Sequence, residues 1–299
     1  MSTIIVQAVV SGIVTGCIYA LVALSLVIIF KTTDVVNFGG GEFVMVGSFL
    51  ALFALVYLGV GYALALLLAA VAMFALGVTF DAVTMNRIGG RLYTRQTELV
   101  PTIVATIGLS YLLKGIVRVV PYTEEPRRIP PLFNAPPIFV GDVVIQAQDV
   151  VIVVATTLIM IGLWAFFRFT MAGRALRAIS QNARAACLSG MPVRTLRMVV
   201  WGLSAGIAAV AGVLFAPKLL ITPDSGTLVM FAFAAAIVGG FTSLPGCVVG
   251  GIVLGVTQNL VGVLIAPQAI SVTPFFIIMV VLLLRPQGLF GDAIALKKV

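Results

Sequence analysis

Residues 4–30 read IIVQAVVSGIVTGCIYALVALSLVIIF, a run without a charged side chain. A helix needs roughly 20 apolar residues to cross about 30 Å of hydrocarbon, so this run predicts a membrane-spanning helix. Residues 1–3 carry no basic side chain, and the run is longer than the apolar region of a cleaved signal peptide. We therefore expect the segment to remain in the mature chain.

The composition of the whole chain agrees with this first run. Of 299 residues, 61% are hydrophobic and only 9% are charged, whereas soluble domains are about 25% charged. The chain has no histidine, which excludes histidine-dependent acid–base catalysis and histidine-ligated metals. The three cysteines (Cys17, Cys187 and Cys247) have no CxxC spacing, and we interpret them as packing residues. The composition predicts a protein embedded in lipid.

Further apolar runs follow the first one along the chain. They lie near residues 38–58, 62–86, 99–119, 149–168, 198–221, 227–241, 246–266 and 271–284. The runs at 38–58 and 227–241 are interrupted by glycine or short, so eight spans with one re-entrant piece is an alternative to nine spans. The predicted fold is an all-α polytopic membrane protein with about 8–9 transmembrane helices, some short or broken. We expect one transmembrane domain over residues 1–299.

The distribution of Lys and Arg between the loops predicts the orientation. Two basic loops contain Arg87, Arg91 and Arg95, and then Arg168, Arg174, Arg177, Arg184, Arg194 and Arg197. Placing both in the cytoplasm, with nine spans, also puts Lys31, Arg285, Lys297 and Lys298 inside, and leaves Lys114, Arg118, Arg127, Arg128 and Lys218 toward the outside. The amino terminus is then external and the carboxyl terminus cytoplasmic. The excess of basic residues is thus explained by the orientation of the chain in the membrane, and no nucleic-acid partner is expected.

Two loops of this predicted topology stand out. The external loop, about residues 121–148, is rich in proline, which disfavours regular helix and favours extended structure. The cytoplasmic loop, about residues 170–197, contains GRALRAISQNARAACLSGMPV at residues 173–193. We expect a short helix from Arg174 to Leu188, ended by Gly190 and Pro192. Its surface combines alanines (Ala175, Ala178, Ala185 and Ala186) with arginines (Arg174, Arg177 and Arg184). Docking to a cytoplasmic protein and contact with anionic lipid fit this helix equally.

Four motifs in this chain resemble those of the LivH-type permeases of branched-chain amino-acid ABC importers. The loop at 173–193 resembles their GRALRA-x-x-QN-x-x-AA-x-x-x-G segment. Residues 37–42 (NFGGGE) resemble NFAHGE, residues 238–251 resemble LGG-x-GS-x-PG-x-x-x-GG, and residues 285–291 (RPQGLFG) resemble RPxGLFG. Two departures limit the comparison. Gly39-Gly40 replaces the Ala-His of NFAHGE, and Arg184 stands where the wider importer motif has glutamate.

The resemblance implies a non-catalytic permease of a bacterial inner membrane, with no cofactor in this chain. ATP would be hydrolysed by separate cytoplasmic subunits, an external solute-binding protein would deliver substrate, and a second, homologous or identical permease would complete the pore. Branched-chain amino acids are the implied substrates, and related permeases carry urea, amides or other small organic solutes. The implied ATPase coupling loop comprises Gly173, Arg174, Arg177, Asn182, Ala185, Ala186 and Gly190. The candidate translocation path comprises Asn37, Gly39, Gly40, Gly41 and Glu42.

Several ionisable residues lie within the apolar runs, and some of them allow two structural interpretations. Glu42 follows Asn37 and three glycines, so it fits the first turn of a helix, where its carboxylate meets free backbone N–H groups. It equally fits a broken helix beside a transport path. We expect Asp81 to reach the membrane interface. Lys114 and Arg118, one turn apart, would contact lipid headgroups or acidic groups of a binding protein.

Rival functions have little support in the residues. No Walker sequence (GxxxxGK[ST]) occurs, so the chain has no P-loop for ATP. A stand-alone ion-coupled carrier would need carboxylates deep in the membrane, and only Glu42 and Asp81 are available. A membrane-embedded enzyme would need a catalytic constellation, and no cluster of acids or histidines provides one.

The charge distribution generates a labelling prediction. A membrane-impermeant maleimide added to intact cells should react with cysteines placed at 122–148, and not with cysteines placed at 174–195. Labelling of a Gln181→Cys variant from the outside would show that the predicted orientation is wrong.

Overall fold

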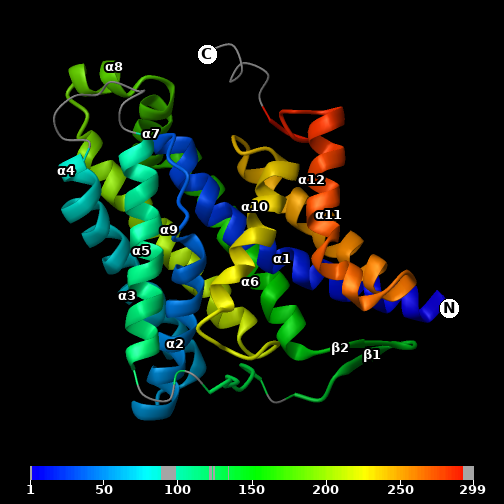
Figure 1. Ribbon diagram of the computed structural model, residues 1–299. Coiled ribbons are helices and arrows are strands. Elements are labelled where there is room, and N and C mark those ends of the chain that lie inside the picture. Colours follow the sequence, from blue (N-terminus) through cyan, green and yellow to red (C-terminus); the bar gives the residue numbers. More distant parts are fainter. Residues whose placement is uncertain (1, 89–98, 121–122, 124, 134, 292–299) are drawn as a thin grey trace. The chain divides into compact units, whose positions relative to one another are not determined.

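The computed structural model describes residues 2–88, 99–120, 123, 125–133 and 135–291. Within this part of the chain, the regular elements are helices except for one two-stranded hairpin (Figure 1). In chain order they are α1 (Ser2–Thr33), α2 (Gly40–Tyr57), α3 (Tyr62–Phe80), the π-helical turn η1 (Asp81–Met85), α4 (Asn86–Ile88), α5 (Leu99–Val119), β1 (Ile138–Val140), β2 (Val143–Ile145), α6 (Ala147–Phe169), α7 (Met171–Gln181), α8 (Ala183–Leu188), α9 (Val193–Phe215), the 3-10 turn η2 (Ser225–Thr227), α10 (Leu228–Gly239), α11 (Leu244–Leu264), the 3-10 turn η3 (Pro267–Ser271) and α12 (Thr273–Leu284).

Every apolar run identified in the sequence lies on a helix. Among the described residues, seven helices are long and apolar enough to cross a membrane: Thr3–Thr33, Gly40–Tyr57, Tyr62–Ile88, Val100–Val119, Ala147–Phe169, Val193–Phe215 and Leu244–Leu264. Two further apolar helices are shorter, at Ser225–Gly239 and Thr273–Leu284. At 1.5 Å per residue, the 12 residues of α10 or α12 extend about 18 Å, less than a full crossing. The protein is therefore a polytopic helical membrane protein.

The expectation that residues 38–58 form a short or interrupted span is wrong. Gly39 precedes α2 as its N-cap, and Gly40 and Gly41 form its first turn, so the glycines begin the helix without breaking it. The second short helix is instead α12 at the other end of the chain. There η3 occupies residues 267–271 of the last apolar stretch, and α12 begins only at Thr273 with a proline in its first turn.

The chain divides into two compact units, which interleave along the sequence. Unit 1 comprises residues 1–27, 130–157 and 227–299, and unit 2 comprises residues 28–129 and 158–226. Each unit is described below by itself, within the described residues.

Unit 2 is organised around α9, which packs along both α3 and α2 (Figure 1). The helices approach closely because glycines lie at the contacts. A Cβ on Gly77 of α3 would overlap the Trp201 carbonyl oxygen of α9, and one on Gly47 of α2 would overlap Ala209. Gly202 in turn faces the ring of Phe74, at 2.8 Å from a hypothetical Cβ. Small residues that admit a neighbouring backbone are the usual means of packing helices in lipid.

Unit 1 pairs α11 with both α1 and α10 through the same device. Cβ atoms on Gly12 and Gly16 of α1 would lie 2.6 Å from the Cα atoms of Val256 and Ile252. The glycine pairs Gly12/Gly16 in unit 1 and Gly202/Gly206 in unit 2, each spaced four residues apart, thus serve helix packing.

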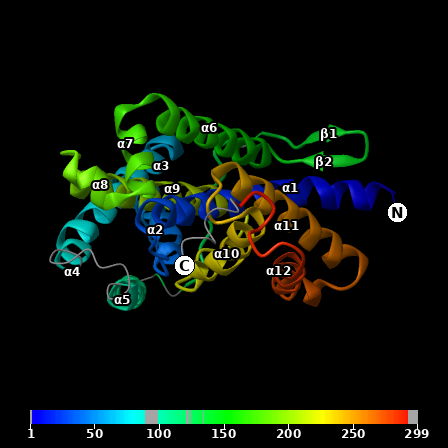
Figure 2. The same cartoon turned by 90° about the horizontal axis from the view of Figure 1, so that it is seen from above.

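The hairpin β1–β2 also belongs to unit 1 and lies in the proline-rich loop, where extended structure was expected. Its second strand is held beside the start of α1 by the Gln7 side chain (Figure 2). The Gln7 amide donates to the Val144 carbonyl (3.0 Å) and accepts from the Val144 N–H (2.9 Å).

The glycine contacts of unit 2 generate a stability prediction. Gly77→Ala should destabilise the protein by about 1–3 kcal/mol, because the added methyl group overlaps the backbone of α9. Gly115→Ala on α5 is the matched control, since no atom lies within 4 Å of its hypothetical Cβ. It should leave stability unchanged or raise it by up to about 1 kcal/mol through helix propensity. Thermal unfolding of both variants in detergent measures the difference, and equal midpoints would contradict the packing argument.

Candidate functional site

The loop between α6 and α9 is folded as α7 and α8, which lie together at one end of unit 2 (Figure 1). Thr170 caps α7 by accepting a hydrogen bond from the Gly173 N–H at 3.0 Å. A Cβ on Gly173 would overlap the Phe166 carbonyl, so α7 folds back tightly against the end of α6. Leu176 and Ile179 are buried together with Gly173, whereas Arg174 and Arg177 are exposed. The apolar face of α7 thus contacts the chain itself, and its arginine face points outward.

The prediction of one helix from Arg174 to Leu188 is wrong, because the helix breaks at Asn182. This residue has extended backbone angles (φ −155°, ψ 95°), so α7 ends and α8 begins at the same position. Its Oδ1 accepts a hydrogen bond from the Ala185 N–H at 3.0 Å and thereby caps α8. An asparagine offers the backbone this alternative to continued helix, a signal that the good helix formers on both sides concealed.

The residues after the break differ in exposure. Ala185 is exposed, whereas Ala186 is 5% exposed and packs within the chain, so the expected continuous alanine surface is not available. Cys187 is exposed, which contradicts its interpretation as a packing residue, while Cys17 and Cys247 are buried as expected. Gly190 has φ +78° and no atom within 4 Å of a hypothetical Cβ. It ends the loop with the positive φ that such a helix stop requires.

The segment before α2 brings together the second group of predicted site residues. Asn37 Oδ1 accepts a hydrogen bond from the Gly39 N–H at 3.0 Å, and Gly39 caps α2. Glu42 lies in the first turn of α2 and is 6% exposed. The placement in a first helical turn is the one that the sequence indicated. Among the described residues, the buried Nδ2 of Asn37 has no hydrogen-bond partner.

A column of polar side chains on α5 faces this segment, and the sequence analysis missed it. Five polar residues recur at every fourth position of α5, so each lies about one turn from the next along a stripe that winds gradually around the helix: Thr102, Thr106, Ser110, Lys114 and Arg118. The Glu42 carboxylate lies close to Ser110 and Lys114. Gly226 lies against the same carboxylate, 3.2 Å from its Oε1 to a hypothetical Cβ. The four-residue spacing was the signal available in the sequence.

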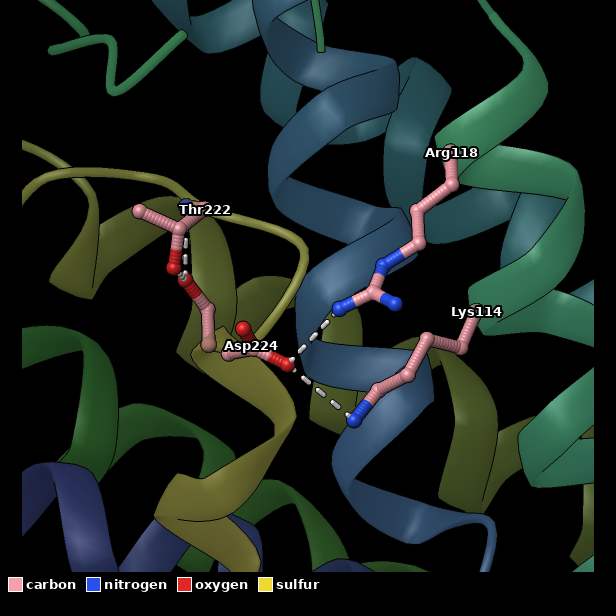
Figure 3. Close-up of polar contacts among 5 residues, drawn as sticks. Lys114, Arg118, Thr222 and Asp224 are labelled. Atoms are coloured by element: carbon pink, nitrogen blue, oxygen red, sulfur yellow. Dashed lines mark hydrogen bonds and ion pairs between the residues drawn. The ribbon is translucent and has the colours of Figure 1, made fainter. Parts of the chain in front are cut away.

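The outer members of this column reach an aspartate in the loop before α10. Figure 3 shows Lys114 and Arg118 extending from α5 toward Asp224, where each lies 3.4 Å from Oδ1. The loop is turned by Ser225, whose hydroxyl accepts from the Thr222 N–H at 2.9 Å. Lys114 and Arg118 thus contact an acidic group of their own chain. Asp224 is 64% exposed, so the two ion pairs contribute only about 0–1 kcal/mol each.

Asp81 is fully buried within the chain, and its position relative to the membrane interface stays a prediction. Its Oδ1 lies 2.8 Å from Nε of Arg197 on α9, so the carboxylate is held in an ion pair inside unit 2. Asp81 is also the first residue of the π-helical turn η1. The sequence separates these two residues by more than a hundred positions, so no local pattern could pair them.

Among the described residues, no group of three or more Cys, Asp or Glu side chains is arranged to hold a metal ion. Two polar features stand out in unit 2: the loop at one end with the exposed Arg174 and Arg177, and the segment where Glu42 of α2 lies close to Ser110 and Lys114 of α5.

Comparisons with known proteins cover nearly the whole chain. Residues 8–283 match the family described as branched-chain amino acid transport system / permease component. The chain is 31% identical over 294 residues to the high-affinity branched-chain amino acid transport system permease protein BraD of Pseudomonas aeruginosa, covering 95% of each. It is 30% identical over 297 residues to the LivH permease protein of Escherichia coli K12, again covering 95% of each. A probable LivH protein of Methanocaldococcus jannaschii is 29% identical over 295 residues, covering 94% of this chain and 90% of that protein.

Proposed function

The chain belongs to the family of branched-chain amino acid transport system permease components, and from this premise we propose which of its surfaces bind the ATPase and the substrate. The protein is a non-catalytic, multi-pass membrane subunit of an ABC transport system, without a cofactor of its own, and homologous to bacterial inner-membrane permeases. Such a system implies an ATPase and a solute-binding protein as partners. In our proposal the whole chain acts as one permease domain, and a second homologous or identical permease completes the pore.

The ATPase docks on α7 and α8. The observation that carries this assignment is the direction of the two faces of α7. A helix that lies on lipid buries its apolar face in the bilayer, but the apolar face of α7 (Gly173, Leu176 and Ile179) is already buried against the chain. Arg174 and Arg177 point outward, which favours a protein partner over a lipid surface.

The partner surface that fits α7 and α8 is acidic with an apolar recess. The sequence contains no Asp or Glu between Asp149 and Asp224, so no acidic side chain from this stretch neutralises the loop. Two apolar side chains flank the arginines, Met171 at 80% and Leu188 at 85% exposed. Opposite charges steer and orient such encounters. The loop would therefore offer positive charge to the ATPase, where the wider importer motif offers the negative charge of a glutamate.

The docking role fixes the orientation that we propose. With α7 and α8 in the cytoplasm, the amino terminus is external, the carboxyl terminus is cytoplasmic and the hairpin β1–β2 faces outward. This agrees with the excess of Lys and Arg in the inner loops. Arg91, Arg95, Lys297 and Lys298, which contribute to that excess, lie outside the described residues.

The substrate path passes the segment from Asn37 to Glu42 and the polar column of α5. Support comes from the unpartnered Nδ2 of Asn37 and from the buried Glu42 carboxylate beside Ser110 and Lys114. Polar and charged side chains inside a membrane protein commonly mark the transport route. An α-amino acid carries both an ammonium and a carboxylate group, and this segment offers groups of both signs.

Branched-chain amino acids are the substrates that we propose, with urea, amides or other small organic solutes as the alternative. Specificity rests largely on the binding protein, so binding measurements on that protein separate these substrates. ATP-driven import predicts uptake that survives collapse of the proton gradient when ATP is maintained. Uptake that is lost under those conditions would instead identify a secondary carrier.

Gly190→Val should weaken ATPase binding, because a β-branched residue opposes the φ of +78° that ends the docking loop. Gly141→Val is the matched control, since Gly141 has φ +62° and open space around it but lies in the hairpin. Co-purification from detergent should recover less ATPase subunit with the first variant only. Equal recovery with both variants would remove the loop from the docking role.

Glu42→Gln should lower the initial rate of substrate uptake about tenfold, which corresponds to about 1.4 kcal/mol, and should leave ATPase recovery unchanged. Glu125→Gln, at a 73% exposed glutamate paired with Arg127, is the control and should transport normally. Uptake into proteoliposomes, with the binding protein and substrate outside and ATP inside, tests this. Normal transport by Glu42→Gln would assign Glu42 a purely structural role.

A further inference from the structure

α9 is the element that connects the docking loop with the proposed path. It begins at Val193, directly after Gly190 and Pro192, and its 23 residues extend about 35 Å. Toward its other end, Gly212 packs against the backbone of Val44, two residues from Glu42. A Cβ on Gly212 would lie 2.7 Å from the Ser48 hydroxyl as well. A displacement of α9 along its axis therefore acts on the start of α2.

α3 is joined to α9 along most of its length. Gly77 meets the Trp201 carbonyl, and the rings of Phe80 and Trp201 lie 5.2 Å apart. At the opposite end of α3, the Tyr62 hydroxyl donates to the Val213 carbonyl at 2.9 Å. Packed interfaces of this kind resist continuous deformation. The two helices can therefore move as one body, provided that their ends at the docking loop are also joined.

The Asp81–Arg197 pair adds an ionic contact between those ends, beside the Phe80–Trp201 ring contact. Arg197 lies one turn into α9, and the Nε–Oδ1 distance is 2.8 Å. Asp81 is fully buried and Arg197 is 19% exposed on its side chain. Burying two charges is costly, and packed apolar side chains of similar size would often stabilise the fold equally well. Stability alone is therefore a weak reason for an ion pair here, in a chain with only ten acidic residues.

The backbone of α3 changes at the same position. The π-helical turn η1 begins at Asp81 and continues to Met85, directly after the α-helical part. π-helical turns are rare in proteins overall, and those that occur often lie at functional sites. In this chain the turn begins at the residue that holds Arg197.

We propose that the Asp81–Arg197 ion pair joins α3 and α9 into one rigid body, which carries the displacement of the docked α7–α8 loop to the start of α2. This inference rests on the docking role proposed above. Asp81 and Arg197 are positioning residues in this proposal, because neither touches ATP or substrate. Without the pair, the first turns of α9 would move with the ATPase while α3 stayed behind.

A double variant tests the proposal without leaving a buried charge unpaired. Asp81→Leu combined with Arg197→Met replaces both partners with apolar side chains, an exchange that folded proteins commonly tolerate. We expect normal recovery of ATPase subunits and a loss of binding-protein-stimulated ATP hydrolysis by about 5- to 150-fold, the range of typical coupling between sites. Arg197→Lys, which keeps the positive charge, should retain part of the stimulation. Normal stimulation in the double variant would overturn the proposal.

A distance measurement on the otherwise unchanged complex provides a second test, which holds even if the double variant does not fold. Spin labels at Val83→Cys in η1 and Thr195→Cys in the first turn of α9 replace exposed side chains outside the proposed docking surface, in a chain whose Cys17, Cys187 and Cys247 are replaced by serine or alanine. The distance between the labels should stay constant between nucleotide-free and ATP-bound complexes. A distance that changes with nucleotide would overturn the proposal. Failure of the parent chain to bind ATPase at all would instead contradict the docking role.

Discussion

Close approach of helix backbones is the constraint on which the rest of this structure depends. In lipid, helices gain little from burying apolar side chains against each other, so association relies on packing at short distance. α9 meets α3 at Gly77 and α2 at Gly47 and Gly212, positions where a Cβ would overlap the neighbouring helix. These contacts set the position of the α2 start and of the docking loop on the same helix.

Charged residues are few among these packed helices. The chain has 18 basic and ten acidic residues, and the acidic groups inside unit 2 lie beside polar or basic neighbours. Glu42 has Ser110 and Lys114 close to it, and Asp81 has Arg197. Because an isolated charge is costly in such surroundings, each of these acids constrains which helices can be neighbours. The same pairs therefore contribute to the architecture and are the natural places at which a conformational change can be controlled.

Much of the fold could be predicted from the sequence, because hydrophobic length is a local property. All nine apolar runs form helices, and the glycine patterns at Gly12 and Gly202 mark real contacts. The positions at which helices end were harder to predict from the sequence. Asn182 breaks a stretch of good helix formers through its own side-chain hydrogen bond.

The candidate sites, too, were predictable where the signal is local in sequence and unpredictable where it is not. Glu42 could be placed in a first helical turn because glycines and Asn37 precede it, and the exposed arginines of α7 follow from periodicity. The ion pair of Asp81 could not be predicted, because its partner, Arg197, is remote in sequence and adjacent only in the fold. The break at Asn182 also divides the α7–α8 loop into two parts. α7 packs against the end of α6 through Gly173, whereas Leu188 at the end of α8 is 85% exposed. Substitutions at exposed positions of α8 can therefore change the surface that the protein presents without disturbing the packing of α7 on α6.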